Sequence, residues 1–205
     1  MTSPSPARRT QEDRRSESEQ RLLRAARRLI ARNGAAGTTL AEIGLEAGYS
    51  RGLPSERFGS KQALLERLVD SVEQAFQAQV ALDVGDRTGL AAVEARIRAH
   101  FNGALQGATG VRALYLLYME SLTVAPALRA RIAALSRAYR DAFARHLREA
   151  QAAGEIRRDV DPAQQALVIL GAIRGLINQW LIEPRGVDLA AARTTLVATV
   201  RRALT

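Results

Sequence analysis

Residues 38–69 read TTLAEIGLEAGYSRGLPSERFGSKQALLERLV and contain the clearest helix signals of the chain. Thr39 stands three residues before a glutamate, a capping-box spacing that predicts a short helix over 39–47. Ser50 is a favoured helix cap and predicts a second short helix over 50–58. Two short helices separated by only a few residues predict a tight helical hairpin.

The turn between these two helices contains Gly48. Glycine suits such a short turn because it adopts positive φ without a steric penalty. A preceding helix over 16–33, ended by Gly34, supplies apolar side chains against which the hairpin can pack. These elements predict a three-helix unit over 16–60 with a helix-turn-helix over 40–59.

The remainder of the chain, residues 61–205, predicts only helices. No segment shows the alternating, β-branched pattern of a strand. After a long fourth helix capped by Ser60, further helices are expected over 89–106, 110–123, 126–153, 162–183 and 188–204. The predicted fold class is all-α, with about nine helices in an N-terminal three-helix domain and a larger C-terminal helical domain.

Composition excludes several classes of protein. The 205 residues include no cysteine, which excludes a disulfide scaffold, a thiolate zinc site and a redox pair, and fits a reducing cytoplasm. No apolar run approaches the ~20 residues needed to cross a bilayer, and the N-terminus lacks the apolar region of a secretory signal. Residues 1–15 are expected to form a disordered basic arm that includes Arg8 and Arg9.

The net charge of +9 does not identify a partner by itself. Lys61 is the only lysine among 30 basic residues, and richness in arginine and alanine is what a GC-rich genome produces. Residues 1–60 hold 11 Arg against 7 acids, so the N-terminal part is only moderately richer in positive charge. The positions of the arginines therefore matter more than their number.

An enzyme is one alternative to a binding protein. His100 and His146 are the only near-neutral acid–base groups; they lie on different predicted helices without a serine or carboxylate constellation. His146 stands among arginines and is expected on a solvated face. Neither a phosphate-binding glycine loop nor a metal-ligand spacing occurs, so we expect no catalysis, no metal and no cofactor.

The 38–69 stretch, together with SEQRLLRAARRLIARNGAAG before it, resembles the DNA-binding domain of the TetR family of bacterial repressors. The detailed resemblance covers about residues 16–70, and the remainder matches only in its run of amphipathic helices. The residues that carry it are Thr38, Thr39, Ile43, Gly44, Ala47, Gly48, Tyr49, Ser50, Gly52, Phe58, Ser60, Lys61, Leu64 and Leu65.

The resemblance implies a DNA interface on the second and third helices. Arg51 is the candidate for a bidentate contact to guanine, with a plain phosphate contact as the other interpretation. Lys61 is expected to contact a phosphate, because a cation in the first turn of a helix does not stabilise that helix. The full set of expected DNA contacts is Thr38, Thr39, Ser50, Arg51, Gly52, Ser55, Arg57 and Lys61.

The recognition helix departs from the family pattern at two positions. Ser55 stands where the family has a tyrosine, and Arg57 where it has histidine or tyrosine, so Arg57 would supply charge in place of a hydroxyl contact. Pro54 falls just past the first turn if Ser50 is the cap, which predicts a short or distorted recognition helix.

The C-terminal half, residues 61–205, is expected to sense a ligand and to dimerise. The helix over 162–183 is apolar around most of its circumference, so it is either a central core helix or, with helix 188–204, a homodimer interface. Aromatic side chains in the middle helices could line an apolar pocket or form plain core, with Glu120, Asn178 or Gln179 as polar anchors. The expected pocket residues are Phe101, Tyr115, Tyr118, Met119, Tyr139, Phe143 and Trp180, with Gly103, Gly107 and Gly110 either gating the pocket or ending helices.

These observations and the resemblance predict a cytoplasmic, ligand-responsive transcriptional regulator of the repressor type. Its expected partners are a palindromic double-stranded DNA operator, a second copy of the chain and an unidentified small-molecule effector, with no membrane. The alternative is a helical interaction or membrane-surface module without sequence-specific DNA binding. Salt-sensitive, sequence-selective binding to a palindromic duplex distinguishes the two.

Overall fold

A computed structural model describes residues 10–205, and within this range the protein has nine α-helices, one short 3-10 helix and no strand. The predicted all-α class is therefore confirmed. The helices are α1 (Gln11–Asn33), α2 (Leu40–Glu46), α3 (Leu53–Phe58), α4 (Lys61–Val84), α5 (Gly89–Gln106), α6 (Ala108–Glu120), η1 (Pro126–Leu128), α7 (Arg129–Ala152), α8 (Pro162–Ile182) and α9 (Leu189–Leu204).

Helix α1 begins earlier than the sequence suggests. Thr10 caps it, because its hydroxyl accepts from the Asp13 amide while the Asp13 carboxylate accepts from the Thr10 amide. The helix start predicted at Ser16 is therefore wrong, and residues 11–15 of the expected arm are helical. The rest of that arm, with Arg8 and Arg9, lies outside the described residues.

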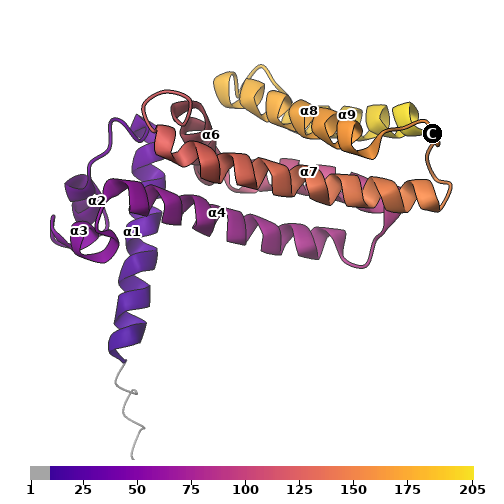
Figure 1. Cartoon of the computed structure of the whole chain (residues 1–205). Coiled ribbons are helices and arrows are strands. Elements are labelled where there is room, and N and C mark those ends of the chain that lie inside the picture. Colours follow the sequence, from indigo (N-terminus) through magenta and orange to yellow (C-terminus); the bar gives the residue numbers. More distant parts are fainter. Residues whose placement is uncertain (1–9) are drawn as a thin grey trace, which may run out of the picture.

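The helices are arranged so that α1, α2 and α3 gather at one end of a longer helical body (Figure 1). In that body α5 packs against α4, α7 and α9, and α7 packs against α8. Helix α1 crosses α6, which makes α6 the main contact between the two parts of the molecule.

The largest cluster of buried side chains runs across the predicted boundary at residue 60. Leu22 and Ile30 of α1 and Ile43 of α2 join Leu64 of α4 and Leu117 of α6 in this core. A second core lies between α5, α7, α8 and α9. The helix-turn-helix is therefore seated directly on the helices that follow it.

Two expectations about the C-terminal part are corrected. His146, expected on a solvated face, is only 6% exposed, and its Nδ1 lies 2.9 Å from a Glu149 carboxylate oxygen. Helix α8 is long and apolar enough to cross a membrane, with a mean hydropathy of 1.4, whereas no such run was expected. Only 28% of an 18-residue apolar segment of α8 is buried inside the protomer, so much of this helix faces outward.

Candidate functional site

The helix-turn-helix is fixed by a capping box and a glycine turn. Thr39 caps α2: its hydroxyl accepts from the Glu42 amide, and the Glu42 carboxylate accepts from the Thr39 amide at 2.7 Å. The backbone and hydroxyl of Thr39 lower the pKa of Glu42 because both donate to its carboxylate. Gly48 has φ of 79°, as the turn was expected to require.

The recognition helix α3 begins at Leu53, three residues after the predicted cap. A helix capped by Ser50 would need an amide hydrogen at residue 54, which Pro54 lacks. Starting at Leu53 places Pro54 in the first turn, where that loss costs little. The prediction of a short helix is confirmed, while Ser50 as its cap is wrong.

Glycine at position 44 allows α2 to approach the start of α3. A Cβ atom there would lie 2.3 Å from the Ser50 carbonyl oxygen and 3.2 Å from Cδ of Pro54. Pro54 is buried in this contact. The close approach sets the position of α3 against α2.

Most of the residues expected to contact DNA lie on the surface of this unit. Thr39, Ser50, Arg51, Gly52 and Ser55 are exposed, and Arg57 and Lys61 are half-buried. Thr38 differs, since it is 1% exposed, its hydroxyl donates to the Gly34 carbonyl at 2.7 Å and its amide donates to the Ala35 carbonyl. Both donors of Thr38 are thus used inside the protein, leaving Thr39 as the exposed member of the pair.

The charges on this unit divide into paired and unpaired groups. Arg28 and Arg32 of α1 both pair with Glu46 of α2, and Arg67 pairs with Glu19. Among the side chains of residues 10–205, no carboxylate lies within ion-pairing distance of Arg51, Arg57 or Lys61. Within the described part of the chain, Arg51 in the turn, Arg57 on α3 and Lys61 at the start of α4 are thus cations without an ion pair, as are Arg24 and Arg27 on α1.

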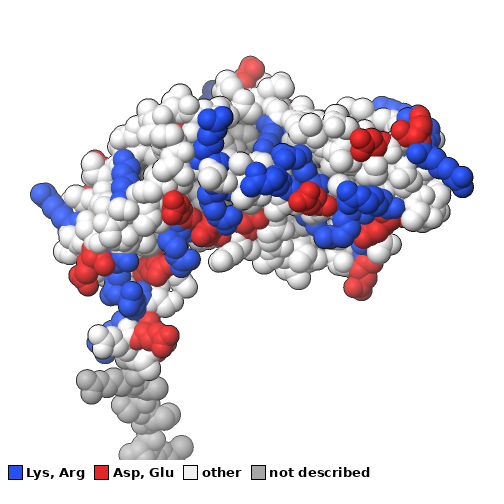
Figure 2. Space-filling view, viewed as in Figure 1, with Lys and Arg blue, Asp and Glu red and all other residues white. Residues whose placement is uncertain are grey.

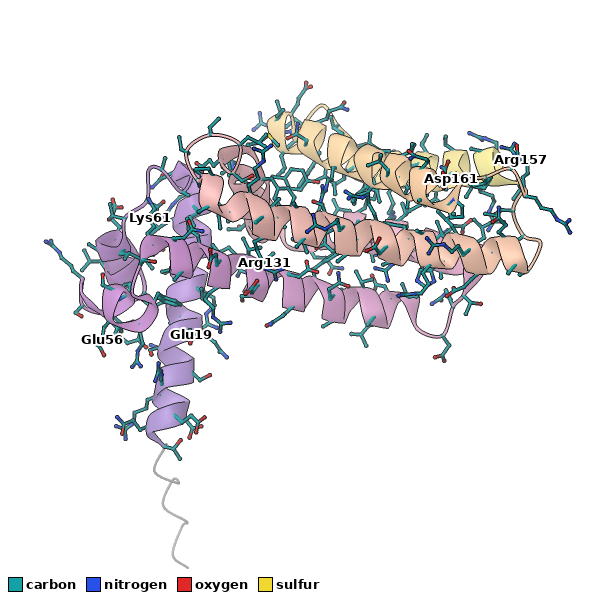
Figure 3. The ribbon with its side chains drawn as sticks, viewed as in Figure 1. Glu19, Glu56, Lys61, Arg131, Arg157 and Asp161 are labelled. Carbon is teal, nitrogen blue, oxygen red and sulfur yellow. The ribbon has the colours of Figure 1, made fainter. Side chains whose placement is uncertain are left out.

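The surface around this unit carries both signs of charge. Figure 2 shows acidic and basic side chains intermixed over the visible face of α1 to α4. Figure 3 places Lys61 at the end of the molecule formed by α2 and α3, with Glu56 on α3. No large field of one sign covers this face of the unit.

A cavity of about 340 Å³ lies between α1, α4, α5, α6, α7 and α8. Of the seven expected pocket residues, Tyr115, Tyr118 and Tyr139 line it, and the glycines at 103, 107 and 110 also form part of its wall. Burial raises the pKa of Tyr118 to about 12, so this phenol stays protonated at neutral pH.

The other expected pocket residues lie elsewhere. Phe101 and Phe143 are fully buried in the second core, and Trp180 packs against that core. Met119 is 58% exposed on α6. Of the expected polar anchors, Asn178 and Gln179 are exposed on α8 and Glu120 binds a backbone amide.

The sequence did not predict the polar groups of the cavity wall, of which Arg27, His100 and Arg174 are the main ones. His100 contacts Phe76, Tyr139 and Phe143, with ring centroids 4.7 to 5.8 Å away. Burial lowers the pKa of His100 to about 3, and the guanidinium groups of Arg96 and Arg174 add to this effect. The imidazole is therefore neutral, and its buried Nε2 has no hydrogen-bond partner.

Helix α6 connects the cavity with the helix-turn-helix. Tyr115 and Tyr118 on this helix line the cavity, and Glu120 at its end accepts from the Ala35 amide at 2.8 Å. Ala35 lies in the loop between α1 and α2, beside Gly34. A displacement of α6 would thus act directly on the loop that leads into α2.

The chain matches two family models with complementary ranges. Residues 22–68 match the model described as bacterial regulatory proteins of the tetR family, and residues 94–196 match the tetracyclin repressor-like C-terminal domain. Within residues 10–205, no group of three or more histidine, aspartate or glutamate side chains is placed to hold a metal ion.

Individual relatives agree with these matches. The chain is 26% identical over 190 residues to the HTH-type transcriptional regulator TtgR of Pseudomonas putida, covering 89% of this chain and 88% of that protein. A TetR transcriptional regulator from Chloroflexus aurantiacus superposes with a TM-score of 0.81 at 23% identity, over 91% of this chain and 96% of that one.

A second similar structure is AibR, solved in complex with isovaleryl coenzyme A and operator DNA. It has a TM-score of 0.74 and 23% identity over 89% of this chain and 97% of that one. The two family models together span the helix-turn-helix and more than half of the chain. The protein therefore belongs to the TetR family of bacterial transcriptional regulators.

Proposed function

We propose that this regulator is a cytoplasmic repressor that binds a palindromic operator as a homodimer and leaves it when a small molecule fills the tyrosine-lined cavity. The observation that carries the proposal is the set of unpaired cations, Arg51, Arg57 and Lys61, on the helix-turn-helix unit of a TetR-family chain. Cations without internal partners are available to neutralise phosphates and to read base edges.

The outer face of α8 supports the homodimer, because it exposes the large apolar side chains of Leu167, Val168 and Ile182. Apart from Ala163, the exposed residues of α8 recur at helical spacing as one stripe: Gln164, Leu167, Val168, Gly171, Gly175, Asn178, Gln179 and Ile182. A Cβ at either glycine would meet nothing within 4 Å, so this face is open and a second helix can approach closely. Exposed small residues of α9, Ala191, Thr194, Thr195 and Ala198, continue the surface.

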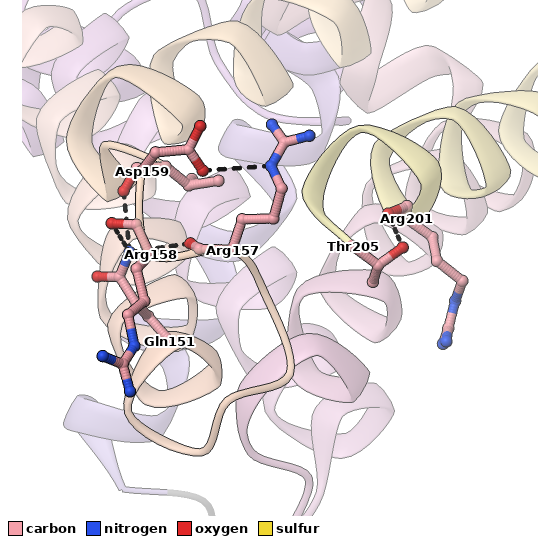
Figure 4. A network of polar contacts seen from close by, with 7 residues as sticks. Gln151, Arg157, Arg158, Asp159, Arg201 and Thr205 are labelled. Carbon is pink, nitrogen blue, oxygen red and sulfur yellow. Dashed lines mark hydrogen bonds and ion pairs between the residues drawn. The ribbon is translucent and has the colours of Figure 1, made fainter.

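The far end of the bundle holds α8 and α9 in place for such an interface. The Gln151 side-chain amide donates to the carbonyls of Arg157, Arg158 and Val160, which fixes the connection from α7 to α8 (Figure 4). The Arg157 amide donates to the Leu204 carbonyl at the end of α9. A dimer that pairs α8 and α9 of one protomer with α8 and α9 of its partner would have a four-helix interface, and each protomer already holds its two helices together.

A twofold dimer explains how the chain would read a palindrome. Two recognition helices about 34–36 Å apart fit successive major grooves on one side of a duplex. We assign Arg51 to a base edge, and Thr39 and Lys61 to phosphates at the N-termini of α2 and α4. Ser50, Gly52 and Ser55 are small, so the backbone of α3 can enter the groove.

Substitution of Arg51 and Lys61 tests the DNA-binding part of the proposal. We expect Arg51→Ala to weaken binding to the duplex upstream of the chain's own gene by about 1–3 kcal/mol and to relax the choice of base at one position. Lys61→Ala should weaken all duplexes alike and lower the salt slope by about one. Fluorescence anisotropy with cognate and scrambled duplexes over a salt series measures both effects.

The surface variant Arg137→Gln on α7 is the matched control, because it removes an exposed charge away from the helix-turn-helix. Unchanged binding by both test variants would refute the site assignment. Binding to anionic vesicles with no preference among duplexes would instead favour the membrane-surface alternative.

A further inference from the structure

The charged residues that line the cavity are all cationic. Arg27 of α1 and Arg174 of α8 carry the formal charges, and no aspartate or glutamate belongs to the lining within residues 10–205. The remaining wall is aromatic, aliphatic or neutral and polar, with the three tyrosines, Phe76, Gln79 and Gln106 as its larger members. A ligand that fills this space meets positive charge and apolar surface together.

Neither cation has a carboxylate partner among the described residues. The Arg174 guanidinium lies 5.0 Å from the centroid of the Tyr118 ring and donates to the Ser136 hydroxyl at 3.0 Å. Arg27 Nε is buried without a hydrogen-bond partner. Arginine presents five N–H donors, so most of the capacity of both groups remains for a ligand.

A third arginine adds to the positive potential from behind the wall. Arg96 is 7% exposed, its Nε and Nη1 have no partner, and its guanidinium lies 5.9 Å from the centroid of the Phe143 ring. Burial is the main cause of the low pKa of His100, and Arg96 and Arg174 add to it because both disfavour a proton on the imidazole. Buried cations without a counter-ion are costly, and a bound anion would relieve that cost.

Glu73, a carboxylate that interacts with Tyr118 and Tyr139, already has hydrogen-bond donors of its own. Glu73 of α4 accepts from the Tyr139 hydroxyl and from the Gln77 amide at 2.8 Å. Its oxygens are thus engaged with neutral donors on the outer side of the tyrosine. The lining itself therefore carries two cations and, within residues 10–205, no carboxylate.

We infer that the effector is an anionic amphiphile, a carboxylate on an aromatic or aliphatic body, whose carboxylate pairs with Arg174 while its body packs against the tyrosines. This inference rests on the proposed ligand-responsive function and names its ligand class. Arg27 supplies a second cation from α1 and lies beside Gly110, where a Cβ atom would be 3.5 Å from Arg27 Cδ. The cavity volume of about 340 Å³ lies at the small end of the range for ligand pockets, which suits a compact acid.

Matched probes that differ only in the head group test the inference. We would measure binding of 4-phenylbutyrate, 4-phenylbutanol and 4-phenylbutylamine, and of octanoate, octanol and octylamine, to the full chain by calorimetry. We expect each carboxylate to bind at least about tenfold more tightly than its alcohol, with the amine weakest. Equal affinities, a preference for the amine, or no saturable binding by either carboxylate would overturn the inference.

Variants assign the preference to the arginine. Arg174→Gln should lower carboxylate affinity to that of the alcohol and change alcohol affinity less than about twofold, whereas Arg174→Lys should retain part of the preference. Arg27→Gln should cause a smaller loss, and Arg137→Gln on the outer face of α7 should cause none. A carboxylate preference that survives Arg174→Gln in a folded protein would contradict the role of Arg174.

The DNA assay is kept separate so that the two proposals can fail separately. Carboxylate binding without release of the upstream duplex would support the ligand class and refute the ligand response. Duplex binding that is released by the amines or alcohols, but not by the carboxylates, would support the ligand response and refute the ligand class.

Discussion

Gly44 and Gly48 have different physical reasons to be glycine. Gly48 has φ of 79° and open space around it, so a side chain there costs only backbone strain. Gly44 is packed against the Ser50 carbonyl, so a side chain there must push the two helices apart. We expect Gly48→Ala to lower the free energy of unfolding by about 1 kcal/mol and Gly44→Ala by about 2–3 kcal/mol.

Urea unfolding and operator binding of both variants check this difference. Gly48→Asn is the control, because asparagine tolerates positive φ and should be milder than alanine. Gly44→Ala should also weaken DNA binding, since it displaces α3. If Gly44→Ala proves no worse than Gly48→Ala, the close approach of α2 and α3 does not set the recognition helix.

The buried His100 makes stability depend on pH. Its pKa is about 3 in the folded chain and about 6.5 when unfolded. Between these values only the unfolded chain binds the proton, so the free energy of unfolding falls as the pH falls. From about pH 6.5 to about pH 5 the wild type should lose up to about 2 kcal/mol more than His100→Gln.

Urea unfolding at about pH 7 and about pH 5 measures this effect. Comparison with His100→Gln subtracts the contribution of the other groups that titrate in the same range. Equal pH dependence in the two proteins would mean that His100 takes up its proton without unfolding.

At the scale of the element, helix types were predictable and helix starts were not. Thr10 with Asp13 and Ser16 with Glu19 have the same capping-box spacing, and the structure uses the first pair. Pro54 has no amide hydrogen, so α3 starts where this proline falls in its first turn. This constraint outweighed the capping preference of Ser50. Cap residues mark possible starts, and packing selects among them.

The cavity wall shows a second limit of sequence reasoning. Aromatic content pointed to the three tyrosines, but it could not give the rotation of each helix, so Met119 faces solvent and Phe101 faces the second core. Arg27 and Arg174 were missed because an arginine in a helix usually marks a solvated position. The signal that could have found Arg174 is its isolation as the one charge within α8.

Glu120 gives an element-scale prediction for the contact between α6 and the helix-turn-helix. Its carboxylate accepts from the Ala35 amide, and such charge-assisted bonds contribute about 1.5–3 kcal/mol. We expect Glu120→Gln to increase hydrogen exchange at Ala35 by about tenfold or more while amides in α9 exchange as before. Exchange measured by NMR checks this, and an unchanged rate at Ala35 would show that α6 does not hold the loop.

For the molecule as a whole, family membership confirms the prediction of a transcriptional regulator from a non-enzymatic family. One sequence motif was enough to predict a transcriptional regulator because the helix-turn-helix is local. Its caps, turn glycine and small residues lie within about twenty residues of one another. The ligand cavity is assembled from six helices, so its composition depends on tertiary packing that no local pattern encodes.

The apolar face of α8 gives a whole-molecule prediction. Val168 is 60% exposed, so Val168→Glu should leave the protomer folded but place two carboxylates near the twofold axis. We expect a shift from dimer to monomer in analytical ultracentrifugation, unchanged helix content by circular dichroism, and loss of operator binding. Leu82→Glu is the matched control, because Leu82 is 76% exposed on α4. A Val168→Glu protein that remains dimeric would place the interface elsewhere.

Arg27 belongs to the first helix of the DNA-binding unit and also to the wall of the cavity between the helices. The two units of this regulator are therefore not interchangeable modules. A hybrid that takes its first 60 residues from another family member would acquire a new operator preference and, with the same exchange, a changed cavity. With the ligand response proposed above, engineering a biosensor from this chain would require position 27 to be treated as part of the cavity.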